Sequence, residues 1–176
     1  SNKARYEARP EARFVPPFAD TGDVSASNNV LYGFEVAWKK ERMWAQGEYI
    51  RSDLEAGVDD YKFDGGALQF GYFLTDFTRP WDNLFGVWGR VKPENNYKWG
   101  NPFKKSGGGI WEVAGRLSTV DLNDDAVRGG AVRDLTFGLN WYPNTTSKFQ
   151  FNWINSRVED LGTANIWVFR YQYAIR

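Results

Sequence analysis

The residues best suited to chemistry in this chain are charged side chains that alternate at fixed spacing. Near the start, Arg5, Arg9 and Arg13 alternate with Glu7 and Glu11 at intervals of two residues. Side chains at that interval lie on one face of an extended strand, so these groups would form a single row. Such a row could bind anions in succession. The alternative, which the residues favour, is that the opposite charges along the row neutralise each other.

Later stretches place further polar side chains on the equivalent face. Arg116 and Arg170 are the cations among them that could bind a passing anion, and ion pairs with Glu112 or Glu48 are the alternative. With signs this mixed, we expect a wet or ion-paired interior rather than a uniformly charged filter. The predicted pore-lining set is Arg5, Glu7, Arg9, Glu11, Arg13, Glu35, Lys39, Glu48, Glu112, Arg116, Asn140 and Arg170.

Composition excludes several other kinds of chemistry. The chain has no Cys and no His, which removes thiolate nucleophiles, His-based acid–base catalysis and the usual zinc sites. We therefore expect no enzyme activity, no metal and no cofactor. Lys plus Arg equals Asp plus Glu at 22 each, so no net charge attracts nucleic acid.

The elements that must position these groups are strands. Bulky apolar residues alternate with polar or small ones, as in Leu135, Phe137, Leu139 and Trp141, and this period of two is typical of strands. No helical periodicity of useful length is present, and no apolar run is long enough for a spanning helix. The predicted fold is all-β and antiparallel, with eight strands near residues 5–14, 30–39, 42–52, 66–75, 111–118, 134–142, 149–154 and 167–175.

The connections between these strands are expected to differ in length. Short turns are predicted near residues 40–41 and 143–147, and longer loops at 53–64, 121–130 and 157–164. Short turns on one side and longer loops on the other are typical of outer-membrane barrels. Residues 76–108 have no clear period and form an irregular connection that is too long for a simple hairpin. The chain is otherwise a single segment, residues 1–176.

The aromatic content indicates where the apolar faces point. Nine Trp, nine Tyr and thirteen Phe make 18% of the chain, and most of these rings fall on the apolar faces. An eight-stranded barrel has too little internal space to hold them. We therefore expect the rings to face lipid and the polar side chains to line a lumen, as in a transmembrane β-barrel. A soluble two-sheet sandwich, which can bury more side chains, is the alternative.

Several stretches occur together in the order of a known family. They are residues 9–11 (RPE), 72–75 (YFLT), 89–93 (GRVKP), 111–116 (WEVAGR), 121–124 (DLND), 129–130 (GG), 135–142 (LTFGLNWY) and 169–172 (FRYQ). On these residues the chain resembles the phosphate-selective porin O and P family of bacterial outer membranes. Each stretch is weakly specific, whereas the ordered set is more so.

The resemblance implies a sixteen-stranded trimeric porin that passes anions, with this chain as the C-terminal half of the barrel. It implies the lipid bilayer and small anions as partners, possible phosphate transport and a likeness confined to that half. The family's constriction loop belongs to the other half, so phosphate selectivity is not carried over residue by residue. The resemblance carries over only generic lumen positions such as Arg116 and Arg170.

Two other functions fit the pattern. One is a closed eight-stranded outer-membrane barrel with a structural or adhesive role, its interior filled by ion pairs such as Arg9 with Glu48. The other is a soluble β-barrel binding module. For the pore, we expect Leu139→Arg to destabilise the protein and the neighbouring Asn140→Arg to be tolerated.

Overall fold

The computed structural model describes residues 2–57, 59–97, 107–124 and 127–175 of the 176-residue chain. All strand pairs within these ranges are antiparallel, and the same ranges contain no helix. None of the described segments therefore forms a helix with the length and apolarity of a membrane span. The predicted all-β antiparallel class is confirmed.

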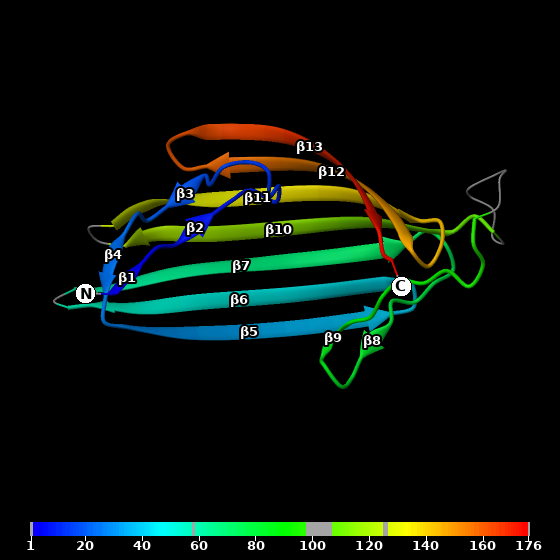
Figure 1. Cartoon of the computed structure of the whole chain (residues 1–176), viewed down its shortest axis with the longest axis horizontal. Helices are drawn as coiled ribbons and strands as arrows, with labels where there is room; N and C mark the ends of the chain where they lie inside the picture. The colour runs from blue at the N-terminus through cyan, green and yellow to red at the C-terminus, as the bar shows by residue number, and fades with distance from the viewer. Residues whose placement is uncertain (1, 58, 98–106, 125–126, 176) are drawn as a thin grey trace.

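Seven long strands form one sheet in the order β13-β12-β11-β10-β7-β6-β5. Figure 1 shows them side by side in chain order, each joined to its predecessor. Among the described residues β5 and β13 have no second neighbour, so the sheet is open and no barrel closes. The strands are β5 Asn28–Lys40, β6 Met43–Ala56, β7 Asp59–Phe73, β10 Ile110–Asp124, β11 Val127–Tyr142, β12 Ser147–Val158 and β13 Gly162–Tyr173.

The predicted strand at residues 5–14 is wrong, which lowers the count of long strands from eight to seven. This part of the chain contributes only β2, Glu7–Ala8, which pairs with β3, Ala19–Asp20. Two residues further on, Pro10 has no N–H to donate to a sheet, and the chain turns as Ala12 N–H donates to the Pro10 carbonyl. A second small pair joins β1, Asn2–Ala4, to β4, Val24–Ala26.

The three predicted longer loops are wrong as well, because the strands run through them. The β6–β7 hairpin pairs as far as Ala56 with Asp59, and β10 pairs with β11 as far as Asp124 with Val127 after a bulge near Asp121. In these ranges, polar residues are paired in extended strands beyond the apolar middle of the sheet. Their polarity therefore did not indicate a loop. All hairpin connections are short at both ends of the sheet.

A long connection joins β7 to β10. Its described part carries a small hairpin of β8, Trp81–Asp82, and β9, Val87–Trp88. Residues 98–106 of the predicted irregular stretch lie outside the described residues. We call the end of the sheet with residues 41–42, 74–97, 107–109 and 143–146 the long-connection end. The opposite end, with residues 56–57 and 159–161, is the hairpin end.

The two faces of the sheet differ in what covers them. The outer face carries rings such as Phe34, Phe70, Phe137 and Phe169, which are well exposed, at 68% for Phe34 and 69% for Phe169. The inner face is covered at both ends. At the hairpin end the N-terminal segment, residues 2–26, packs Ala8 and Ala19 onto the sheet (Figure 1).

Two apolar clusters therefore lie on the inner face. At the hairpin end the cluster is Ala8, Ala19, Leu54, Tyr61, Phe63, Leu122, Val132 and Val158. At the long-connection end it is Trp44, Phe73, Val91, Ile110 and Tyr142, with Phe77 and Trp88 packed against it. Between the clusters the inner face is polar, and this polar band and the N-terminal segment opposite it together hold most of the candidate residues.

Candidate pore wall

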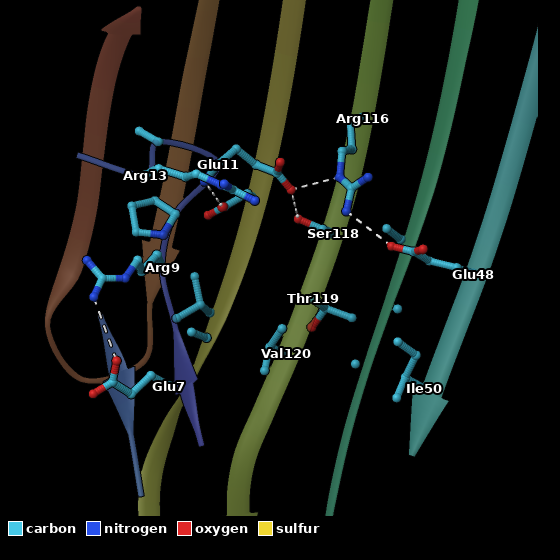
Figure 2. A pocket seen from close by; sticks show the side chains of 18 of the residues that line it. Glu7, Arg9, Glu11, Arg13, Glu48, Ile50, Arg116, Ser118, Thr119 and Val120 are labelled. Atoms are coloured by element: carbon cyan, nitrogen blue, oxygen red, sulfur yellow. Dashed lines mark hydrogen bonds and ion pairs between the residues drawn. The ribbon is translucent and has the colours of Figure 1, made fainter. Parts of the chain in front are cut away.

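A pocket of about 1340 Å³ separates the N-terminal segment from the inner face of the sheet. Figure 2 shows its charged lining, which comes from the N-terminal segment on one side and from the sheet on the other. The predicted residues that line it are Glu7, Arg9, Glu11, Arg13, Glu48, Arg116 and Arg170. The structure thus brings seven of the twelve predicted residues to one cavity.

Arg116 is the hub of this lining. Its Nε lies 2.7 Å from Glu11 Oε1, and its Nη2 lies 3.3 Å from Glu48 Oε1 (Figure 2). Ser118 Oγ donates to the same Glu11 oxygen at 2.7 Å, and the Glu11 N–H donates to Asp134 Oδ2 at 3.0 Å. These bonds join the N-terminal segment to β6, β10 and β11. Of the two partners expected for Arg116, Glu48 is found and Glu112 is not.

The expected neutralisation within the N-terminal row is found for Arg5, Glu7 and Arg9, whereas Glu11 pairs with Arg116 and Arg13 has no described carboxylate within ion-pair distance. Arg5 binds Asp20, with its Nε donating at 2.9 Å, and lies 3.2 Å from Glu7. Arg9 lies 3.7 Å from Glu7 rather than pairing with Glu48, so the expected Arg9–Glu48 pair is wrong. The hydrogen bond from Arg5 lowers the pKa of Asp20 to about 2 and raises that of Arg5. Arg5 itself is not part of the pocket lining.

Two cations of the pocket have no such partner. Arg13 and Arg170 are exposed, and no described carboxylate lies within ion-pair distance of either. Arg13 comes from the N-terminal segment and Arg170 from β13, opposite Gln150 on β12. The lining of the pocket therefore combines neutralised pairs with two cations that are able to attract an anion.

Glu112 lies outside this pocket and is 1% exposed. Its Oε1 accepts from Trp44 Nε1 at 2.7 Å and from Arg79 Nη1 at 3.3 Å. Its Oε2 accepts from Asn140 Nδ2 at 2.9 Å and from the Tyr142 hydroxyl at 2.8 Å. With four donors, the carboxylate is satisfied as a buried charge must be.

Arg79 connects this buried centre to the long connection. Its guanidinium stacks 3.9 Å from the centre of the Trp44 ring, and the centre of the Trp88 ring lies 5.2 Å from the same guanidinium. Burial lowers the pKa of Arg79, while Glu112 opposes that shift. The long connection is thereby fixed to the inner face of the sheet rather than extending from its edge.

The remaining predicted residues make other contacts. Glu35 accepts a hydrogen bond from Gln46, and Lys39 Nζ donates to the Arg79 carbonyl at 3.1 Å. Asn140 is 7% exposed and is held between Glu112 and Gln150. Because Asn140 is buried and makes both hydrogen bonds, we expect Asn140→Arg to lower stability rather than to be tolerated.

Sequence reasoning missed Arg79, Trp44 and Trp88. Arg79 lies in a stretch without a clear period. Trp44 lies on the same face of its strand as Glu48, and this face was expected to line the lumen. Gly71 was the available signal for Trp44, because it lies across from Trp44 and a Cβ there would come within 2.2 Å of the Trp44 ring nitrogen. A missing side chain opposite a tryptophan indicates that the ring packs flat on the inner face.

Comparisons with known proteins show the family of the chain. The model of the family described as phosphate-selective porin O and P matches residues 1–175. Porin O of Pseudomonas aeruginosa is 27% identical over 153 residues, covering 80% of this chain and 33% of that protein. An uncharacterised protein of Caulobacter vibrioides is 29% identical over 156 residues, covering 85% of this chain and 29% of that protein. The chain thus spans about a third of the length of these relatives.

Proposed function

Because this chain belongs to the phosphate-selective porin O and P family, we propose that it forms part of the wall of a water-filled diffusion channel. Its location is the bacterial outer membrane, and the family is one of channel proteins rather than enzymes. The proposed solutes are small anionic or polar molecules. Phosphate is the first to test, since the family is named for it.

The observation that carries the proposal is the contrast between the two faces of the sheet. Large apolar side chains are exposed on the outer face of all seven long strands, where lipid would cover them. On the inner face the charged side chains of the polar band surround the pocket of about 1340 Å³. Apolar-out and polar-in is the pattern of a barrel whose lumen holds water.

The proposal includes additional strands and a homotrimer. A seven-stranded sheet with two open edges does not enclose a lumen, and lipid-exposed edges are costly. The relatives are about three times as long as this chain, so a longer polypeptide of that kind has enough residues for the missing strands. The trimer rests on the family resemblance.

Arg13 and Arg170 are the residues we propose to attract anions, because they line the pocket without a described carboxylate partner. Arg116 is expected to position the N-terminal segment through Glu11 and Glu48. We therefore assign anion selectivity to the unpaired Arg13 and Arg170. The paired Arg116 instead fixes the position of the N-terminal segment in the pocket.

Conductance in planar bilayers tests the proposal. We expect the protein, purified together with the strands that close the sheet, to form stable pores that favour anions, and Arg170→Gln to lower the anion-to-cation permeability ratio roughly twofold. Arg157→Gln removes the same charge from the outer face and should leave that ratio unchanged. A protein that opens no pore, or that stays a monodisperse monomer without detergent, would contradict the proposal.

A further inference from the structure

The outer face of the sheet carries two arginines directly beside each other. Arg133 of β11 and Arg157 of β12 are register partners, and both are exposed. Their chain neighbours Asp134 and Ser156 are buried on the inner face, which places the two arginines on the outer one. Like charges directly opposite each other destabilise a sheet, so the pair exists at a cost unless an anion offsets it.

No counterion for this pair is present in the described part of the chain. None of its carboxylates lies within ion-pair distance of Arg133 or Arg157. The contrast is with Arg51, also on the outer face, whose Nε lies 2.7 Å from Asp53. On the outer face, Arg51 is therefore neutralised by Asp53, whereas Arg133 and Arg157 remain able to bind an anion.

An apolar groove of about 550 Å³ adjoins the arginine pair. Its lining includes Leu68, Leu117 and Leu135, which are register neighbours on β7, β10 and β11, two residues nearer the middle of the sheet than the pair. Thr119 lies between the leucines and the hairpin end, where its hydroxyl can donate a hydrogen bond. Next to Thr119, Gly66 has no side chain, which leaves the groove open on that side.

We propose that the arginine pair and the leucine groove form a binding site for one lipid whose phosphate head group carries a net negative charge. The two guanidinium groups match phosphate oxygens in charge and in hydrogen-bonding geometry, and the leucines would contact an acyl chain. Basic residues at the boundary of an apolar surface bind lipid head groups in this way. The inference rests on the proposed function only in that the outer face must lie in a membrane.

Native mass spectrometry of the protein released from detergent micelles tests this site. The micelles would contain equal amounts of phosphatidic acid and phosphatidylcholine with the same acyl chains. We expect the protein to retain phosphatidic acid preferentially. Arg133→Gln and Arg157→Gln should each reduce that preference by roughly fivefold, and the double variant should lose it. Folding is not at risk, because each substitution removes a repulsion between like charges.

Two controls separate the possible sources of the anion and of the effect. Arg51→Gln, at the neutralised arginine of the same face, should keep the lipid preference. Excess inorganic phosphate should not displace the lipid, because it cannot fill the leucine groove. Displacement by inorganic phosphate, or equal lipid retention by the wild type and the double variant, would overturn the inference.

Conductance separates this inference from the proposed function. The double variant should conduct like the wild type, since both arginines lie outside the lumen. A protein that conducts but shows no lipid preference overturns the lipid site alone. A protein that neither inserts nor conducts overturns the channel proposal.

Discussion

At the scale of single residues, Glu112 determines how the long connection is held. Replacing it with Gln removes the charge that balances Arg79 and places an amide N–H₂ among four donors. Leaving a buried charge without its partner costs about 3–5 kcal/mol. We expect Glu112→Gln to lower the free energy of unfolding by that amount, measured by denaturant unfolding in detergent.

The matched control for this substitution is Glu35→Gln. Glu35 is exposed and accepts one hydrogen bond from Gln46, so its loss should change the free energy of unfolding little. Equal losses for the two variants would show that the Glu112 centre contributes no more than a surface contact. A loss confined to Glu112→Gln supports the buried network.

We expect Asp20 to make the docking of the N-terminal segment depend on pH, because its bond to Arg5 holds two parts of that segment together. Its pKa of about 2 lies below the ordinary value of 3.8, because Arg5 donates a hydrogen bond to it. A carboxylate with a lowered pKa stabilises the folded state above its ordinary pKa and loses that effect as pH falls through the lowered one. We expect residues 5–20 to become more susceptible to protease as pH falls from about 4 to about 2.

Asp20→Asn removes the titrating group and is the control for that experiment. In this variant the protease susceptibility of residues 5–20 should be raised at neutral pH and should change less below pH ~4. An acid-stable protease serves both measurements. If wild type and variant show the same acid response, Asp20 does not control the docking.

The sequence predicted which charged residues share a face of the sheet better than it predicted their partners. Alternation placed Glu48 and Arg116 on the same face, and their ion pair is present. Arg9 was paired with the wrong carboxylate, because its partner depends on how the segment folds back over the sheet. Asn140 and Arg79 both donate hydrogen bonds to Glu112. Because Arg79 comes from a stretch without a clear period, the sequence did not indicate that Asn140 would be buried there.

At the scale of elements, the two faces of the strands predict opposite responses to a charge. Leu139 lies on the outer face of β11, and Asn152 of β12 is on the inner face, where it lines the large pocket. Leu139→Arg should lower stability by about 2–4 kcal/mol if the residue lies mid-bilayer, whereas Asn152→Arg should be tolerated. Unfolding in lipid vesicles measures both, and equal damage would contradict the membrane orientation.

Alternation predicted the middle of each long strand and failed at the ends. The apolar period stops near residue 52 in β6, while the pairing continues to Ala56. Beyond the apolar belt, the backbone hydrogen bonds of a hairpin persist without a hydrophobic signal to mark them. The strand prediction for residues 5–14 failed for the opposite reason. These residues alternate as in a strand, but Pro10 cannot donate a hydrogen bond and interrupts the pairing.

At the scale of the whole molecule, the open edges of the sheet are the main unmet requirement. Among the described residues, β5 and β13 each pair on one side only. In a bilayer, unpaired backbone N–H and C=O groups along a strand cost several kcal/mol each, so spanning sheets are closed. Two such edges on one sheet need partners, which additional strands of a longer polypeptide or other copies of the chain can supply.

Amide exchange and native mass in detergent test this requirement together. In a closed assembly, amides of β5 and β13 should exchange as slowly as those of β10, which pairs on both sides. In the 176-residue chain by itself, we expect either faster exchange along both edge strands or association into multimers that protects them. A monomeric 176-residue chain whose β5 and β13 amides are as protected as those of β10 would contradict this reasoning. It would mean that the chain closes its own edges, and the lumen would then have to be the pocket that the N-terminal segment already covers.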